Sequence, residues 1–256
     1  LRDGLIGNVY MARGLVFRWR GDIGKKGPGT IPQGLDYDLW TGPAAMLPYS
    51  EDWVHYNWHW QWNYGCGDVG NQGIHETDLC MWGLSVGLPE VITAGGGKFL
   101  FDDSKETPEV LATTYYYPKE KKIIEFEVRP WMTNQENGVD VGNIFYGSEG
   151  YLVVYNYDRY ESFLGRNKKP GPAKREGGDH YANFIKAVRA HDKSILNAPV
   201  ETAHLSSGLA HLGNIAYRTG RTLYFDPVTE KFVKDKKADK YLTRPPRKPF
   251  VVPDEV

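Results

Sequence analysis

The sequence predicts an α+β fold, with one open, mainly antiparallel β-sheet and helices packed on one of its faces. Between residues 90 and 157, short β-branched and aromatic runs alternate with hairpin-type turns such as PKEK and GSEG. Strands joined by such short turns run antiparallel. Helical periodicity occurs before this block, over 71–86, and after it, over 179–192 and 199–220.

The part of the chain before the first predicted helix contains three different kinds of segment. Apolar residues alternate over 8–20, which predicts a long strand. The Gly- and Pro-rich loop 21–50 is too long for a plain connector, and its large apolar residues, such as Tyr37 and Trp40, predict a loop docked on the body. Aromatic and polar residues alternate in HYNWHWQWN (55–63), which predicts an extended segment with tryptophans on one side.

The elements after the central strands are marked by capping residues and prolines. Asp179 is a predicted N-cap of the first late helix, and the second late helix begins near Pro199 and ends at Gly220. The basic block 165–178 is predicted to be a linker or surface loop. A last strand leads to an irregular tail, 241–256, and we interpret the whole chain, 1–256, as a single domain.

Composition excludes several classes of partner. The 31 basic and 32 acidic residues give a net charge of -1, which predicts neither a nucleic-acid partner nor binding to an anionic membrane. No apolar run approaches the ~20 residues that cross a bilayer. Cys66 and Cys80 are expected to be buried free thiols. The chain starts at Leu1 rather than Met, so we expect that something upstream was removed; the compartment stays open between the cytoplasm and an exported location.

A set of short motifs, in a fixed order, resembles a known family. The motifs are LWTGPA (39–44), WHWQWNYGCGDVGNQGIHETDLCMWGL (58–84), GGGKF (95–99), NFIKAVR (183–189), HLSSGLAHLGNIAYRTGRTLYFD (204–226) and RKPFVVP (247–253). Together they resemble the C-terminal domain of the Gfo/Idh/MocA family of oxidoreductases, in its bacterial sugar-type branch. The resemblance covers nearly the whole chain.

The resemblance implies a sheet like that of the C-terminal domain of glyceraldehyde-3-phosphate dehydrogenase, whose open face forms the substrate floor and a homo-oligomer interface. It also implies NAD or NADP as cofactor and a carbohydrate or polyol as substrate. The nucleotide would be bound mainly by a Rossmann domain absent from this chain, because GGGKF precedes no phosphate-binding helix and we identify no G-x-G-x-x-G fingerprint after a predicted strand. The family's Glu-Lys-Pro motif, with its catalytic lysine, is also missing.

The resemblance implies three catalytic candidates. His75 matches the family's substrate-contacting histidine, and imidazole can accept a hydroxyl proton near neutral pH. Asn71 stands one turn earlier, where many relatives carry Asp; its amide can orient a hydroxyl but cannot take its proton. Asp78 would either orient the imidazole or be solvated, and both alternatives stay open. Glu76 is predicted to lie on the surface.

The substrate-binding candidates come from the aromatic segment and the long loop. If 55–63 is extended, its polar side faces the cleft, and Trp40 can stack on a sugar ring. The candidates are Trp40, His59, Gln61, Asn63 and Asp68. A metal site is the alternative interpretation of His55, His59, His75, Asp68 and Asp78. An extended segment does not bring such ligands close together, so no metal is predicted.

The function that the resemblance implies for this chain is the substrate-binding and oligomerisation domain of an NAD(P)-dependent oxidoreductase acting on a sugar, a sugar derivative or a cyclic polyol. One alternative is a glycoside-cleaving enzyme, working either by oxidation and elimination or by direct hydrolysis with Asp36, Asp38 and Asp68. Another is a stand-alone carbohydrate-binding module. His204 and His211 are assigned to a packed helix rather than to a site.

Overall fold

The computed structural model describes residues 1–251 and 253 and contains a ten-stranded sheet with the order β10-β9-β2-β3-β4-β1-β5-β6-β7-β8. The strands are β1 (Val9–Val16), β2 (Val91–Gly97), β3 (Val110–Tyr117), β4 (Lys122–Val128), β5 (Val141–Gly147), β6 (Gly150–Tyr155), β7 (Arg159–Leu164), β8 (Lys169–Arg175), β9 (Leu223–Asp226) and β10 (Lys231–Phe232). The helices are α1 (Tyr37–Thr41), η1 (Asn57–Trp60), α2 (Gly67–Asn71), α3 (Gly73–Leu84), α4 (His180–Ala190), η2 (Lys193–Ile195), α5 (Val200–Thr219) and α6 (Lys236–Asp239).

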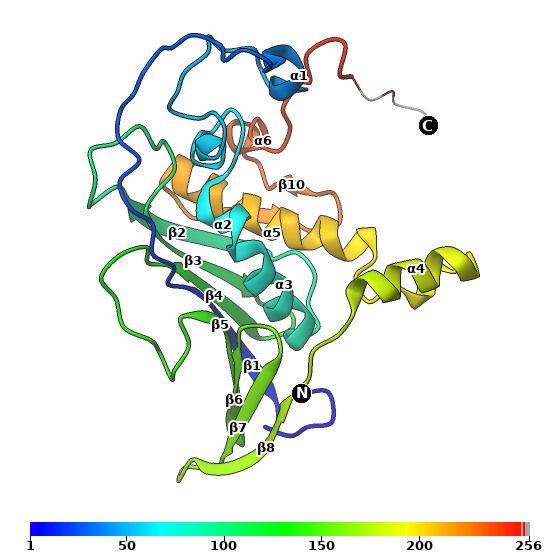
Figure 1. The fold of residues 1–256 in the computed structure, drawn as a ribbon. Coiled ribbons are helices and arrows are strands. Elements are labelled where there is room, and N and C mark those ends of the chain that lie inside the picture. The colour runs from blue at the N-terminus through cyan, green and yellow to red at the C-terminus, as the bar shows by residue number, and fades with distance from the viewer. Residues whose placement is uncertain (252, 254–256) are drawn as a thin grey trace.

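The sheet is mainly antiparallel, and the predicted fold class is confirmed. Only β1 and β4 pair in parallel; every other described pair of neighbours is antiparallel. The predicted hairpins at PKEK and GSEG connect β3 to β4 and β5 to β6. The first strand enters the middle of the sheet, so strands distant in sequence flank it on both sides (Figure 1).

Helices α2, α3 and α5 cover one face of the sheet, as predicted (Figure 1). Helix α3 lies close to β1 because Gly14 has no side chain; a Cβ atom there would lie 3.0 Å from the Cβ of Glu76. Gly73 has a similar role, because a Cβ atom there would lie 2.3 Å from the Phe126 ring. The residues beneath the helices, such as Tyr115 and Ile124, are fully buried.

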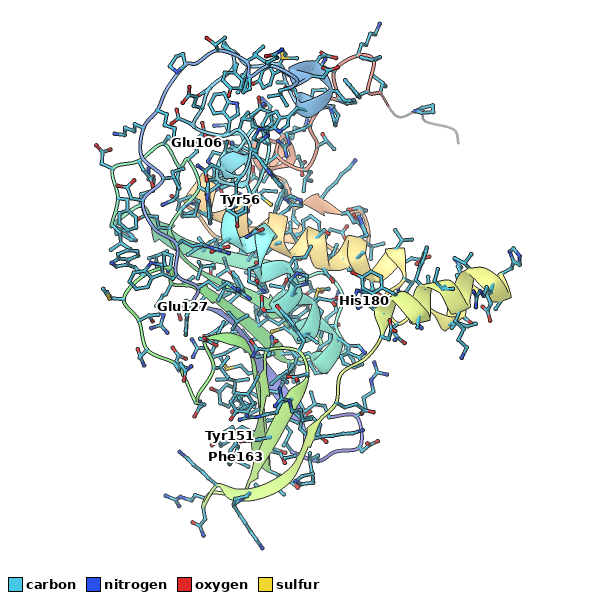
Figure 2. The ribbon with its side chains drawn as sticks, in the orientation of Figure 1. Tyr56, Glu106, Glu127, Tyr151, Phe163 and His180 are labelled. Atoms are coloured by element: carbon cyan, nitrogen blue, oxygen red, sulfur yellow. The ribbon has the colours of Figure 1, made fainter. Side chains whose placement is uncertain are left out.

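The opposite face of the sheet, which we call the open face, carries no helix (Figure 1). Register places Tyr146, Tyr151 and Phe163 side by side on adjacent strands of this face. Their rings form a partly buried row, with Tyr151 and Phe163 stacked at a centroid distance of 4.8 Å (Figure 2). Arg13 and its glutamate partners lie farther along the same face.

Two local predictions were wrong. Segment 55–63 is not extended: turns lead into the 3₁₀ helix η1, so Trp60 is buried while Trp58 is 43% exposed. Aromatic packing against the neighbouring loop therefore overrides the period-two pattern. The block 165–178 is not merely a loop, because β8 lies within it and pairs with β7 at the edge of the sheet. Prolines and basic side chains are compatible with an edge strand.

The remaining elements largely follow their capping signals. The Asp179 carboxylate accepts a hydrogen bond from the Ala182 amide at the start of α4, and Gly220 ends α5 with a φ of 65°. Helix α4 projects away from the body (Figure 1), and its apolar side chains Tyr181 and Phe184 are exposed. Within residues 1–251 and 253, no helix has the length and apolar character of a membrane span.

The long loop is docked on the body, as predicted. It contains α1, whose Tyr37 is buried, and an isolated bridge pairs Pro28 with Ser50. Cys80 is buried as expected, whereas Cys66 is only partly buried. Both thiols are free.

Candidate functional site

The clearest cluster of polar groups lies where helix α2 meets helix α3. We call it the α2–α3 corner and define it as Asn71, Gln72, His75, Glu76 and Tyr157. The helices meet at Gln72 because Gly73 lets the chain pass against the Phe126 ring. Tyr157 comes from the turn between β6 and β7. The corner thus joins the start of a packed helix to a hairpin far along the chain.

The two principal catalytic candidates are both exposed at this corner. The imidazole of His75 contacts Tyr157 edge to face, with 5.7 Å between ring centroids. Asn71 Nδ2 donates a hydrogen bond of 3.3 Å to Asp68 Oδ1. The amide oxygen of Asn71 takes no part in this bond and can accept a hydrogen bond from another group. The structure therefore brings Asn71 and His75 to one exposed corner.

Glu76 is the functional candidate that sequence reasoning missed. It was predicted to lie on the surface, but its side chain is fully buried against β1. Its Oε1 accepts hydrogen bonds from the Tyr157 hydroxyl at 2.9 Å and from Gln72 Nε2 at 3.3 Å. Its Oε2 has no hydrogen-bond partner among the described residues.

Burial explains the unusual protonation of this carboxyl. It raises the pKa of Glu76 to about 7, and the hydrogen bonds from Tyr157 and Gln72 offset only part of this effect. The pKa of Tyr157 is raised above its usual value, first by burial and then by the adjacent carboxylate. A signal in the sequence could have identified Glu76: it lies on the same helical face as Gly73, Cys80 and Leu84, at spacings of three and four.

Asp68 is held by an arginine rather than left open to a ligand. Arg20 Nε and Nη2 donate to its two carboxylate oxygens at 3.0 and 2.9 Å. Asp68 is buried, and the hydrogen bonds to its carboxylate raise the pKa of Arg20. This bidentate ion pair links the segment that follows β1 to the start of α2.

Asp78 is directed toward α5. Its Oδ1 accepts a hydrogen bond from the Ser206 hydroxyl, so this carboxylate links the two helices that cover the sheet. No hydrogen bond joins Asp78 to His75 in the part of the chain that the structure describes. The sequence left two alternatives for Asp78, a partner of the imidazole or a solvated group. The hydrogen bond with Ser206 corresponds to neither of them.

His59 and Gln61 support the fold instead of lining a cleft. Both are buried, because η1 replaces the expected extended segment. His59 Nδ1 lies 2.6 Å from the Tyr56 carbonyl oxygen, and burial lowers the pKa of this imidazole. Gln61 Nε2 donates to the Ser104 carbonyl at 2.8 Å. His59 and Gln61 therefore do not form the predicted polar side facing the substrate.

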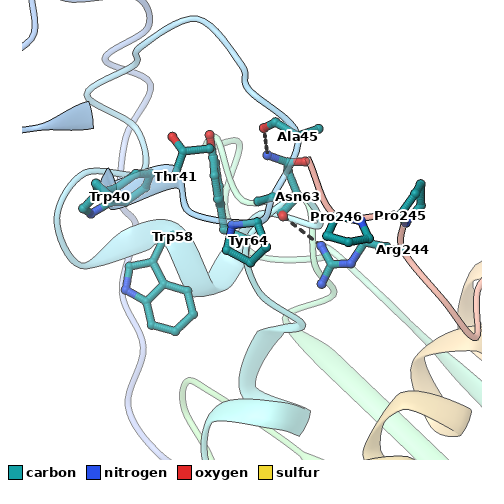
Figure 3. Close-up of a pocket in the computed structure, with 11 residues that line it drawn as sticks. Trp40, Thr41, Ala45, Trp58, Asn63, Tyr64, Arg244, Pro245 and Pro246 are labelled. Carbon is teal, nitrogen blue, oxygen red and sulfur yellow. Dashed lines mark hydrogen bonds between the residues drawn. The ribbon is translucent and has the colours of Figure 1, made fainter. Parts of the chain in front are cut away.

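Trp40 and Asn63 both line a second site, which we call the aromatic hollow (Figure 3). It has a volume of about 370 Å³. Its lining consists of aromatic, polar and proline residues: Trp40, Thr41, Pro43, Ala44, Ala45, Trp58, Asn63, Tyr64, Arg244, Pro245 and Pro246. Asn63 Nδ2 donates to the Ala45 carbonyl at 2.8 Å, and Arg244 donates to the Asn63 carbonyl at 2.8 Å. No residue of α2 or α3 lines this hollow.

The carboxylates considered for direct glycoside hydrolysis are engaged in structural contacts. Asp36 caps α1 by accepting from the Leu39 amide at 2.9 Å. Asp38 forms an ion pair of 2.8 Å with Arg247. Together with the Arg20 contact of Asp68, these partners leave no free pair of facing carboxylates among the three.

Three glycines have the spacing of a dinucleotide fingerprint, but their surroundings do not fit a nucleotide. They follow the 3₁₀ helix η1 instead of a strand, and α2 has only five residues. A Cβ atom at Gly65 would lie 2.4 Å from the backbone of His59, and one at Gly67 would lie 2.9 Å from Thr107. Gly70 likewise packs against Cys66. These glycines therefore serve close packing within the chain, and they lack the strand and the long helix between which a dinucleotide fingerprint lies.

Metal ligands do not gather either. Within residues 1–251 and 253, no group of three or more His, Cys, Asp or Glu side chains has a geometry that could hold a metal ion. Of the three histidines considered as metal ligands, His59 is buried, whereas His55 and His75 are exposed.

The fold is shared with solved oxidoreductases. The WlbA dehydrogenase from Bordetella pertussis, solved with NADH and UDP-GlcNAcA, matches with a TM-score of 0.56 and 16% identity, over 88% of this chain and 57% of its own. The aldose-aldose oxidoreductase from Caulobacter crescentus, solved with glycerol, matches with a TM-score of 0.59 and 12% identity, over 88% and 58%. This chain thus spans less than two thirds of the length of these structures.

A comparison with curated protein sequences gave no significant match. A family model described as "Oxidoreductase family, C-terminal alpha/beta domain" matches residues 9–86 and 158–252. These two segments make up more than half of the chain. The first contains Asn71 and His75, and the second begins at Asp158, directly after Tyr157. The chain belongs to the Gfo/Idh/MocA oxidoreductase family, of which it carries the C-terminal α/β domain.

Proposed function

We propose that this chain is the substrate-binding and oligomerisation part of an NAD- or NADP-dependent oxidoreductase that acts on a sugar, a sugar derivative or a cyclic polyol. The observation that carries the proposal is the exposed His75 at the start of α3, with Asn71 exposed one turn earlier. Both residues lie in a segment matched by the family model.

The chemistry of alcohol oxidation suits these two side chains. The hydroxyl proton must leave as the carbon loses a hydride, and a neutral imidazole can take that proton near neutral pH. The amide of Asn71 can hold the hydroxyl in place but cannot act as the base. A nicotinamide, when bound, supplies the hydride acceptor. The glycine environments described above do not fit a dinucleotide, so we assign its binding to a domain outside this chain.

The substrate class is supported by the relatives and by the aromatic hollow. One structural relative was solved with the nucleotide sugar UDP-GlcNAcA, and another is an aldose-aldose oxidoreductase. In this chain Trp40 and Trp58 offer aromatic surfaces on which a sugar ring can stack, beside the amide of Asn63. The hollow shares no lining residue with the α2–α3 corner, so we assign it to carbohydrate binding away from the reacting hydroxyl.

Self-association through the open face is part of the proposal. The row of Tyr146, Tyr151 and Phe163 is only partly buried, and Tyr116 is 44% exposed on the same face. Exposed apolar patches of this kind are typical of protein interfaces. A second copy of the chain is the occupant expected from the family resemblance.

The test uses the chain joined to its nucleotide-binding domain, with NAD or NADP and a panel of aldoses, nucleotide sugars and cyclic polyols. We expect substrate-dependent formation of reduced nicotinamide, measured by absorbance. His75→Ala is expected to lower kcat/KM at least 100-fold, in line with the loss of a general base. His180→Ala, which changes an exposed histidine on α4, is the matched control and is expected to leave the rate unchanged.

Two results would overturn the proposal. One is a reaction rate that His75→Ala leaves intact. The other is release of free sugar from glycosides without any requirement for nicotinamide, which would favour direct hydrolysis. Release of free sugar that requires a bound nicotinamide but causes no net change in its redox state would instead indicate the oxidation–elimination alternative.

A further inference from the structure

Tyr157 belongs to the α2–α3 corner, but the proposed function gives it no role. It is 53% exposed, and its hydroxyl group binds two corner residues at once. Gln72 Nε2 donates to the Tyr157 oxygen, and the Tyr157 hydroxyl donates to Glu76 Oε1 at 2.9 Å. A phenol hydroxyl has one proton and two lone pairs, so one lone pair of Tyr157 stays available.

Tyr157 is also the corner residue that lines a large hollow in the described part of the chain. The residue lines a hollow of about 620 Å³ between α3 and strands β6 to β8, whose walls include Leu79 and Trp82. On its other side the ring touches the imidazole of His75. His75 does not line this hollow, so it is the ring contact that places Tyr157 beside a small polyol with one hydroxyl at His75.

We propose that Tyr157 is a second substrate-contacting group, which accepts a hydrogen bond from the hydroxyl next to the one held by His75, and that Glu76 is the positioning residue that fixes its direction. The substrate is then held through two neighbouring hydroxyl groups, that is, as a vicinal diol. This inference rests on the proposed function, because it takes His75 as the contact of the reacting hydroxyl.

Glu76 sets the direction of the hydrogen bond through its charge. When ionised it can only accept, so the Tyr157 proton points inward and the free lone pair points outward. A charged acceptor also strengthens the hydrogen bonds linked to it. When Glu76 is protonated it can donate to Tyr157 instead, and the outward lone pair is no longer enforced.

The charged and polar groups around Glu76 are few. Arg18, after β1, favours its ionised form, as do Tyr157 and Gln72. Cys80, from the next turn of α3, is close enough to interact with its charge, and Asn143 on β5 donates to the Glu76 carbonyl at 2.8 Å. Burial dominates over these contacts, so the carboxyl changes charge near neutral pH.

The test measures binding of two probes, trans-cyclohexane-1,2-diol and cyclohexanol, to the full chain by NMR shifts of labelled His75 and Tyr157. We expect the diol to bind about 10-fold more tightly than the mono-alcohol. Tyr157→Phe is expected to remove that preference without weakening cyclohexanol binding, since it deletes only the hydroxyl. His180→Ala, a change of an exposed α4 side chain, is the control.

The role of Glu76 is tested by pH. We expect the affinity for the diol, but not for cyclohexanol, to rise several-fold from pH 6 to pH 8, and Glu76→Gln to abolish this rise while the chain stays folded. A diol preference that survives Tyr157→Phe, or a pH dependence that survives Glu76→Gln, would overturn the inference while the proposed function stands. If neither probe shifted the His75 signals, the substrate contact at His75 would be refuted, and this inference with it.

Discussion

The two faces of the sheet are made by the same strands but are stabilised in different ways. On β4, Ile124, Phe126 and Val128 point under the helices and are almost completely buried. The alternating residues Glu125 and Glu127 point to the open face and pair with Arg13. Alternation along β4 thus places apolar side chains in the helix-covered core and charged side chains on the open face. The open face also holds a smaller buried apolar cluster, which includes Leu15, Ile144 and Val153.

The comparison shows what each face is built to contact. Helices α3 and α5 need a close-packed apolar surface, because cavities and unpaired polar groups there are costly. On the open face, Glu136 from the loop after β4 pairs with both Arg13 and Arg129. Beside this network lies the partly buried aromatic row, which suits a partner more than solvent.

The largest expected effect comes from removing a core ring on the helix-covered face. Phe126→Ala should lower the free energy of unfolding by about 3–5 kcal/mol, because it opens a cavity against Gly73 and Gly14. Urea unfolding followed by circular dichroism measures the loss. Tyr116→Ala on the open face is the matched control and should cost less than about 1 kcal/mol. Equal losses of stability at the two positions would show that the two faces of the sheet do not differ in this way.

The second effect is a pH dependence that originates on the helix-covered face. The pKa of Glu76 is about 7 in the folded chain against 4.5 ordinarily, so the folded state favours the protonated form. Its contribution is complete below about pH 4.5 and is lost as the pH rises to about 7. Since each pH unit corresponds to about 1.4 kcal/mol, the total loss is roughly 3 kcal/mol.

Glu76→Gln should remove this pH-dependent loss. The variant is expected to be more stable than the wild type at pH 8 and to lose that advantage at pH 5, as measured by urea unfolding at both values. A parallel dependence in the wild type and the variant would show that another group is responsible. Glu161→Gln, a change on the open face, serves as the control.

A smaller effect is expected from the ion pairs of the open face. Arg13→Gln leaves Glu125, Glu127 and Glu136 without their shared partner, and should cost about 1–2 kcal/mol because these side chains are only partly exposed. The cost should fall as salt is added. Thermal unfolding at low and high ionic strength measures both. Arg175→Gln, which breaks the exposed pair with Asp158, should change stability little.

The smallest effect on stability, with a distinct effect on association, is expected in the aromatic row. Tyr151→Arg should change the free energy of unfolding by about 1 kcal/mol or less, since this ring is only partly buried. The same change should reduce the mass measured by light scattering, because it places a charge in the proposed interface. A wild-type chain that is strictly monomeric would refute the proposed association.

Much of the fold could be predicted from local patterns, and the exceptions have identifiable physical causes. Strands β3 to β6 follow their β-branched runs and turns, and α5 ends at the predicted glycine. The prediction for 55–63 fails because contacts with residues 104–107 outweigh the alternating pattern: Gln61 donates to the Ser104 carbonyl, and the Trp60 carbonyl accepts from the amides of residues 106 and 107. β8 was missed because its edge position tolerates prolines and charges that a central strand excludes.

The candidate site was predictable only in part. His75 and Asn71 follow from the motif, and they lie together at the exposed corner. Glu76 could not be placed by its residue type, since glutamate is rarely buried. Its burial depends on Gly14 lying opposite it on β1, a contact between positions 62 residues apart that no local pattern contains.

By itself, the sequence determined the α+β class, the family, and the position of His75 at the start of a helix, because periodicity, caps and short motifs are local properties. The tertiary structure decided which face of α3 meets the sheet, and therefore that Glu76 is buried and bound to Tyr157. It also separated the aromatic hollow from the α2–α3 corner. These outcomes depend on packing between distant segments, where burial and hydrogen bonding together outweigh local preference.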